Sequence, residues 1–314
     1  MAALAVPDLS ERERSELISD LDATIAPCAD SPVPLSQCLA EKRACPACKT
    51  AGLMLGRMIH AGAPRTDRQA MYTARFDPKG VVKLEVGESP TKGPADAPVT
   101  IFEWADFECP HCALIAIVLE LMQERFPGQI RVVYKFYALP SHTHALDAAF
   151  AARAAHKQDK FWEMNQIMFE NQDKLEKKDL LVYAQKVGLD QEKFVADFDD
   201  KKTKEFVAAD MKQGDDLGLD GTPMLFCNGR KMPLEKLQPL LPELEAWLKS
   251  EIEAAGKTPA QATARYAQMM AELAPPAPSS SASAGPSAPP PEAPPSAAPS
   301  TSAAPAAGSA APKK

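Results

Sequence analysis

The chain has 314 residues, of which 45% are hydrophobic and 25% charged, and its formal net charge is -7. This composition is ordinary for a globular protein, and since no basic block is present we expect no nucleic-acid partner. No apolar run reaches the roughly 18 residues that a membrane-spanning helix needs.

Residues 1–78 predict a small helical module that contains cysteines. Apolar residues at three- and four-residue steps indicate a helix over residues 10–25, and Ser10 begins a capping box. After a loop rich in proline and cysteine, a second helix is predicted to open at Pro46. A third, short helix is expected over about residues 68–76.

The next segment predicts the strand, helix and strand of an α/β sheet. Residues 81–86 alternate as an edge strand or a linker would, and residues 99–104 form an apolar strand that ends just before Cys109. Pro110 suits the first position of a helix, and a second strand is predicted over residues 130–137. A crossover of this length implies that the two strands pair in parallel.

Helical character then persists over residues 144–211, which indicates a helical insertion. A strand returns over residues 224–227, a turn follows at Asn228-Gly229, and a final helix is expected over residues 234–255. One more helix is predicted over residues 258–273. The remaining tail of Pro, Ala and Ser has too little apolar surface to offset its ordering entropy, so we expect it to be disordered.

The run Cys109-Pro110-His111-Cys112 carries the clearest chemistry. Two cysteines three positions apart at a helix start lie about one turn from each other, close enough to form a disulfide. The first lies over the exposed amides of the helix N-terminus, which favour its thiolate. We therefore expect Cys109 to be the nucleophile and Cys112 the resolving thiol, with His111 adding positive charge near the same sulfur. A structural disulfide and half of a zinc site are the alternatives.

With two further motifs, this centre makes the sequence resemble the DsbA-like branch of the thioredoxin superfamily over about residues 81–255. The motifs are Phe102-Glu103-Trp104-Ala105-Asp106-Phe107-Glu108-Cys109-Pro110-His111-Cys112, Lys160-Phe161-Trp162-Glu163-Met164, and Gly221-Thr222-Pro223. The resemblance implies an α/β thioredoxin fold with an inserted helical domain. The expected domains are a cysteine-containing module over 1–78, a thioredoxin domain over 79–256 with its insertion at about 142–214, a helix over 257–274, and a disordered tail over 275–314.

The resemblance also implies roles for residues around the two cysteines. It implies that Pro223 is cis and that Thr222, Pro223 and Pro110 border the place where an extended substrate peptide pairs with the backbone. Without the resemblance, Thr222-Pro223 would be only an edge or turn device. The resemblance makes Glu103 a proton acceptor for Cys112, and a solvated glutamate on a strand face is the alternative.

Other residues near these motifs are placed outside the site. Asp106 and Glu108 are interpreted as solvated loop acids, which would oppose thiolate formation at a neighbouring cysteine. His142 and His144 are interpreted as loop or cap histidines, and Cys227 as a buried, inert thiol.

Four cysteines in the N-terminal module need a covalent or metal role. They are Cys28, Cys38, Cys45 and Cys48, and the last two repeat the CxxC spacing at a helix start. Structural disulfides, a second redox pair that acts as a relay, and a four-cysteine zinc site all remain open. Nothing near Cys45 is of the kind that tunes a thiol, which favours structural disulfides.

The sequence thus predicts a protein disulfide oxidoreductase that acts as a dithiol oxidase on reduced or misfolded polypeptides in the periplasm or another extracytoplasmic space. An isomerase or reductase of the same fold is one alternative, and a non-catalytic peptide- or metal-binding module is another. We expect no cofactor and no metal, and a redox partner for which a membrane protein is one candidate. No export signal is visible, although Ala3-Leu4-Ala5 resembles the end of a cleaved leader.

Overall fold

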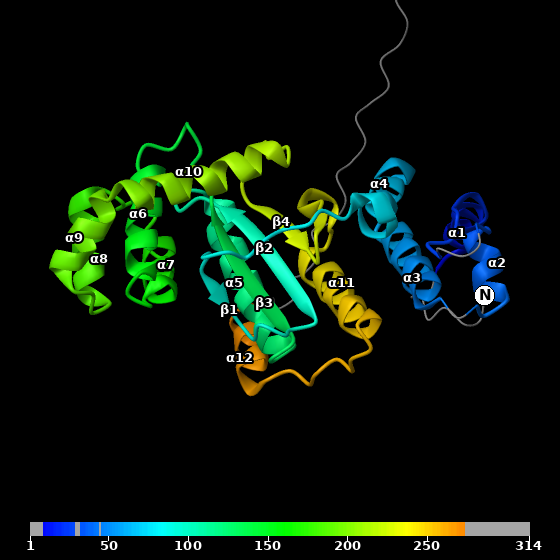
Figure 1. Cartoon of the computed structure of the whole chain (residues 1–314). Helices are drawn as coiled ribbons and strands as arrows, with labels where there is room; N and C mark the ends of the chain where they lie inside the picture. Colours follow the sequence, from blue (N-terminus) through cyan, green and yellow to red (C-terminus); the bar gives the residue numbers. More distant parts are fainter. Residues whose placement is uncertain (1–8, 29–31, 44, 274–314) are drawn as a thin grey trace, which may run out of the picture. The chain divides into compact units, whose positions relative to one another are not determined.

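The computed structural model describes residues 9–28, 32–43 and 45–273, and its residues up to Leu273 form one compact unit (Figure 1). The leader-like residues 3–5 and the tail expected over 275–314 lie outside the described residues. In the part of the chain that is described, no helix has the length and apolar character to cross a membrane.

Four helices make up the N-terminal part of the described chain. They are α1 (Glu11–Ala23), α2 (Leu35–Ala40), α3 (Pro46–His60) and α4 (Arg65–Phe76). The predicted capping box is present, because the Ser10 hydroxyl accepts from the Glu13 amide while the Glu13 carboxylate accepts from the Ser10 amide. Helix α2 was treated as a loop in the sequence analysis. It has six residues, too few to show a helical period, and buries only Leu35 and Cys38.

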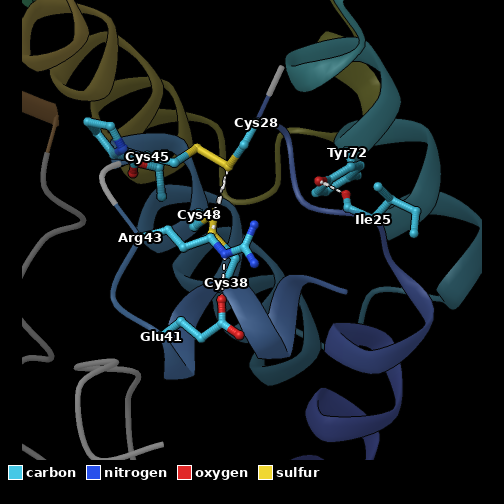
Figure 2. The surroundings of a disulfide bond; sticks show 10 residues. Ile25, Cys28, Cys38, Glu41, Arg43, Cys45, Cys48 and Tyr72 are labelled. Atoms are coloured by element: carbon cyan, nitrogen blue, oxygen red, sulfur yellow. Dashed lines mark hydrogen bonds and ion pairs between the residues drawn. A yellow bond between two sulfur atoms is a disulfide. The ribbon is translucent and has the colours of Figure 1, made fainter. Parts of the chain in front are cut away.

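Two disulfides fix the start of α3, one to the segment that follows α1 and the other to α2 (Figure 2). Cys28 pairs with Cys45, and Cys38 pairs with Cys48. The two cysteines of the CxxC run therefore do not pair with each other, because each is bonded to a cysteine earlier in the chain. Cys38 and Cys48 are buried, whereas Cys28 and Cys45 are half-buried.

The five-stranded sheet has the order β1-β3-β2-β4-β5. Its strands are β1 (Thr91–Lys92), β2 (Val99–Ala105), β3 (Ile130–Phe136), β4 (Met224–Cys227) and β5 (Arg230–Met232). Strands β2 and β3 are parallel, as predicted, and β4 is antiparallel to β2. In this register Glu103 lies between Tyr134 and Leu225. Since β2 is central and almost wholly buried, it has a continuous apolar sequence.

Of the linker and the edge strand that residues 81–86 left open, the structure has the linker. Val81 makes an isolated bridge to Arg230, and Val82 donates to the Gly229 carbonyl at 2.9 Å. The alternation arises because Val82, Leu84 and Val86 pack against a buried cluster on the sheet while their neighbours are exposed. One-sided burial therefore produced a strand-like period without strand pairing.

Helices cover the sheet and form the insertion (Figure 1). Helices α5 (Pro110–Arg125) and α11 (Leu240–Ala254) contribute to one apolar core with β2 and β4. The insertion comprises α6 (Ala145–His156), α7 (Phe161–Phe169), α8 (Lys177–Lys186), α9 (Gln191–Asp199) and α10 (Lys201–Asp216), and α12 (Ala264–Leu273) follows α11. The helix predicted over residues 234–255 is α11. It begins only at Leu240, because residues 234–236 form a short 3-10 turn instead.

Candidate active site

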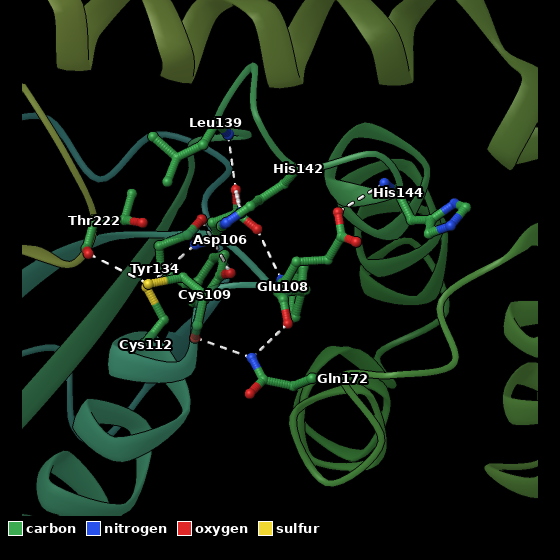
Figure 3. A network of polar contacts seen from close by, with 12 residues as sticks. Asp106, Glu108, Cys109, Cys112, Tyr134, Leu139, His142, His144, Gln172 and Thr222 are labelled. Carbon is green, nitrogen blue, oxygen red and sulfur yellow. Dashed lines mark hydrogen bonds and ion pairs between the residues drawn. The ribbon is translucent and has the colours of Figure 1, made fainter.

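Strand β2 delivers the chain directly to the CxxC run. After Ala105, a three-residue turn leads to Cys109, which is the N-cap of α5, and Pro110 occupies the first helical position. The Cys112 amide donates to the Cys109 carbonyl at 3.1 Å, which places the two cysteines on one helical turn (Figure 3). Both are unpaired thiols in this structure.

The two thiols differ strongly in environment. Hydrogen bonding from the Cys112 thiol, with further support from Thr222 and the backbone amides of Cys112 and His111, lowers the pKa of Cys109 to about 5, against the opposing effect of burial. Burial raises the pKa of Cys112 far above the usual range. Cys109 is 4% exposed and Cys112 is not exposed at all, so a substrate can reach only Cys109.

His111 contributes to this site through its backbone in the structure. Its amide is one of the donors that lower the pKa of Cys109, while its residue surface is exposed, like that of Pro110. The helix terminus thus supplies the amide donors that the sequence analysis expected.

The cis-proline loop lies against the Cys109 sulfur. The Thr222-Pro223 peptide bond is cis, and the Cys109 thiol donates to the Thr222 carbonyl at 3.3 Å. Strand β4 begins directly after Pro223, which is half-buried. The start of a strand and the reactive sulfur therefore lie side by side.

Glu103 lies in the middle of β2 and is only 3% exposed, so it is not a solvated strand residue. Burial raises the pKa of its carboxyl to about 8. Its Oε1 has no hydrogen-bond partner among the described residues, and the side chain lines a cavity of about 380 Å³ together with Ala113, Trp162 and Phe169. A carboxyl in this environment is mostly protonated at neutral pH and can exchange a proton.

A family model described as Thioredoxin matches residues 85–248, slightly more than half of the chain. The chain belongs to the thioredoxin family. The match contains the CxxC run and the cis-proline loop, so it covers all the residues of the site that have been described.

Curated relatives match a comparable stretch of this thioredoxin-family chain. The Na(+)/H(+) antiporter NhaA 3 of Salinispora tropica is 37% identical over 159 residues, which is 49% of this chain and 24% of that protein. The Na(+)/H(+) antiporter NhaA of Herminiimonas arsenicoxydans is 36% identical over 141 residues, 45% of this chain and 22% of that protein. The chain thus spans about a quarter of the length of the curated relatives it matches, and the activity in their names belongs to those proteins.

Solved structures of thioredoxin-like proteins are also similar. A thioredoxin-like oxidoreductase from Silicibacter pomeroyi has a TM-score of 0.42 and 25% identity, and the match covers 50% of this chain and 92% of that one. BdbD from Bacillus subtilis, in its oxidised form, has a TM-score of 0.48 and 20% identity, with 55% and 97% covered.

In this thioredoxin domain Asp106 is buried, and its carboxylate binds two backbone amides and a histidine. The expectation of a solvated loop acid was wrong. Asp106 is 2% exposed, and one carboxylate oxygen accepts from the Glu108 amide at 2.8 Å. The other accepts from the Leu139 amide at 2.7 Å and lies 2.9 Å from Nδ1 of His142 (Figure 3). The sequence places His142 outside the site as a loop histidine. In the structure it pairs with a residue of the turn over 106–109, which is called the catalytic turn below.

Two further polar side chains connect the catalytic turn to the helical insertion. Gln172, in the loop after α7, donates from Nε2 to the carbonyls of Phe107 at 2.7 Å and Cys109 at 2.9 Å. Glu108 accepts from the amide of His144, just before α6, at 2.7 Å. No local sequence pattern identifies Gln172, because its partners are backbone atoms more than sixty residues away.

The remaining cysteine of the thioredoxin domain is inert in this structure. Cys227 lies on β4 opposite Ile101, is fully buried, and has its pKa raised by that burial, as expected for a core thiol. Among the described residues, no cluster with metal-ligand geometry includes Cys109, Cys112 or Cys227.

Proposed function

We propose that this protein is a thiol-disulfide oxidoreductase that uses Cys109 and Cys112 to oxidise pairs of thiols in extracytoplasmic polypeptides. The supporting observation is the contrast between the two sulfurs on one helical turn, with the pKa of Cys109 lowered to about 5 and that of Cys112 raised by burial. The ionised thiol is the species that attacks and leaves in disulfide exchange.

The proposed reaction begins with the Cys109–Cys112 disulfide. A substrate thiolate attacks the Cys109 sulfur, forming a mixed disulfide and releasing Cys112, whose sulfur takes the proton of the Glu103 carboxyl. A second substrate thiolate attacks the substrate sulfur of the mixed disulfide and releases Cys109 as a thiolate. The substrate loses two electrons to the protein, and in the reverse direction Glu103 accepts the proton of Cys112.

The cis-proline loop suits the binding of an extended substrate in this reaction. Thr222 and Pro223 lie beside the Cys109 sulfur at the start of β4, where a peptide backbone can pair as an added strand. Pro110 and His111 are exposed and supply the remaining border in this proposal.

The direction of electron flow follows from the stability of the reduced form. A low pKa at Cys109 stabilises the dithiol relative to the disulfide at neutral pH, which makes the disulfide an oxidant. We expect a reduction potential, measured against glutathione, that is less negative than the roughly -230 mV of glutaredoxins. A value near the roughly -270 mV of thioredoxin would indicate a reductase instead.

The extracytoplasmic setting is part of the proposal. Disulfides persist in oxidising compartments, and the N-terminal module contains two. We assign these pairs a structural role while they are bonded and no part in the exchange with substrate, and we expect a separate redox partner to reoxidise Cys109 and Cys112. A purified protein that binds reduced peptides without changing their redox state would favour the non-catalytic alternative.

Replacing Cys112 with Ser tests the reaction directly. The variant lacks the resolving thiol, so it should accumulate mixed disulfides between Cys109 and substrate in an oxidising extract, detected on non-reducing gels. Cys227→Ser serves as a matched control, because its thiol is buried away from the exchange and should trap nothing. If Cys112→Ser forms no adducts that dithiol releases, thiol exchange at Cys109 is wrong.

A further inference from the structure

The four cysteines of the N-terminal module form a tighter cluster than two separate disulfides require. All four Sγ atoms lie within 4.8 Å of one another. Across the two disulfides, the Sγ atom of Cys28 lies 3.1 Å from that of Cys48 and 3.7 Å from that of Cys38 (Figure 2). In a tetrahedral zinc site with Zn–S bonds of about 2.3 Å, the sulfurs are about 3.8 Å apart.

The local backbone holds these cysteines in two groups. Cys45 is the N-cap of α3, and the Cys48 amide donates to its carbonyl at 3.1 Å, so this pair lies on the first helical turn. Cys38 lies in α2, and Cys28 lies in the segment between α1 and α2. The two-residue spacer between Cys45 and Cys48 is common in structural zinc sites, whereas nine residues separate Cys28 from Cys38.

The surroundings provide opposite charge and a route of entry. A cavity of about 490 Å³ is lined by Cys38, Cys45 and Cys48 together with Lys42, Arg43 and Lys49. Zinc bound by four thiolates carries a net charge of about -2, which these cations would offset. Arg43 also pairs with Glu41 at 2.6 Å, so the cluster is not a bare positive patch.

We propose that Cys28, Cys38, Cys45 and Cys48 form a zinc-binding site when their disulfides are reduced, so that the N-terminal module alternates between a disulfide-bonded and a zinc-bound state. This inference is independent of the reaction proposed for Cys109.

The change of state is balanced. Each disulfide accepts two electrons and two protons from a dithiol, which becomes a disulfide. The resulting four thiols bind Zn²⁺ through four sulfur–zinc bonds and release up to four protons to solvent. A disulfide oxidant reverses the sequence and expels the ion.

Metal titration of the reduced full-length chain tests the proposal. The Cys109→Ser, Cys112→Ser double variant removes the other thiol pair and is reduced with a phosphine, which is not a thiol ligand. We expect one equivalent of Zn²⁺, and with Co²⁺ the charge-transfer and visible bands of a tetrahedral thiolate site. Adding Cys38→Ser should weaken binding by at least the roughly 10–100-fold that loss of an outer-shell partner costs.

A second measurement avoids dependence on variant folding. In the unmutated reduced chain, Zn²⁺ should protect the four module cysteines from alkylation while Cys109 still reacts, as read by mass mapping. Equal labelling of the module cysteines with and without Zn²⁺, or Zn²⁺ bound by the wild type but not by the Cys109→Ser, Cys112→Ser variant, would overturn the proposal.

Discussion

Cys109 and Cys112 lie on one helical turn, but different hydrogen-bond donors and different degrees of burial surround their sulfur atoms. The amides of His111 and Cys112 and the Cys112 thiol donate toward the Cys109 sulfur. Cys112 receives the Asp106 amide at 3.4 Å but is otherwise enclosed in apolar surroundings. Hydrogen-bond donors favour a thiolate and apolar enclosure disfavours it, so one turn of helix contains a thiol that ionises readily and a thiol that stays neutral.

The Cys109 thiolate should therefore disappear only as the pH falls through about 5. Because the folded pKa lies below the ordinary value of 9.0, the stabilisation of the reduced fold is complete above about 9 and is lost on acidification toward 5. Ultraviolet absorption of the thiolate measures its titration, and denaturation of the reduced protein at each pH measures the free energy of unfolding. If the His111 side chain stabilises the thiolate in addition to its amide, His111→Ala should raise the Cys109 pKa and make the disulfide less oxidising, whereas an unchanged potential would show that the helix terminus alone sets it.

Glu103 should make the oxidised protein less stable as the pH rises. Its folded pKa of about 8 exceeds the ordinary 4.5, so stability falls between those two values because the carboxyl ionises in the unfolded chain while it stays protonated in the folded one. Glu103→Gln should match the wild type near pH 4.5 and exceed its melting temperature above pH 8. The exposed Glu85→Gln serves as control, and parallel pH profiles for Glu103→Gln and wild type would contradict the assignment.

At the scale of elements, the catalytic turn is held by two separate parts of the chain. Asp106 connects it to the loop that follows β3, through the Leu139 amide and His142. Gln172 and Glu108 connect it to the insertion. The insertion therefore positions the turn as well as enlarging the fold, since Gln172 binds two backbone carbonyls of the turn and the amide of His144 donates to the Glu108 side chain.

Gln172→Ala should loosen this turn and leave the rest of the insertion intact. Loss of two side-chain hydrogen bonds to backbone carbonyls should cost about 1–3 kcal/mol of unfolding free energy and change the pH profile of Cys109 alkylation. Gln166→Ala is the matched control, because that side chain makes an exposed contact with Glu170. Identical profiles for the two variants would show that Gln172 has no positioning role.

At the scale of the whole described unit, α3 and α4 are connected to α11 by two arginine side chains, of which Arg57 is half-buried and Arg75 buried. Arg57 forms two hydrogen bonds with the Glu243 carboxylate, at 2.7 and 3.1 Å. Arg75 is 3% exposed, lies over the ring of Trp247 at 5.0 Å, and donates to the carbonyl of Ala246. These contacts couple the N-terminal helices to the sheet and its helices, so the domain boundary proposed near residue 78 is not a free hinge.

Arg75→Ala should uncouple the two parts. Removing a buried guanidinium with several hydrogen bonds should cost about 2–3 kcal/mol and divide one cooperative unfolding transition into two, as followed by calorimetry. Arg65→Ala, at a largely exposed position, should leave a single transition. One transition in Arg75→Ala at unchanged temperature would show that the contact does not couple the parts.

Features set by neighbouring residues were predictable from the sequence alone. The apolar run of β2, Pro110 at the first position of α5 and the Ser10 capping box depend on contacts within a few residues, and each is found where expected. The same locality placed Cys109 at a helix N-terminus, whose amides add to the hydrogen bond from the Cys112 thiol in lowering its pKa.

Only the tertiary structure decided features that depend on distant residues. The pairing of Cys28 with Cys45 and of Cys38 with Cys48 follows from how α2 packs beside α3. The CxxC spacing alone had left a pair between Cys45 and Cys48 open. Asp106 is buried because a loop more than thirty residues later folds over it, whereas its own neighbours indicated a solvated acid. Local periodicity reports which face of an element is apolar, but the partner of a polar side chain is determined only when the chain has folded.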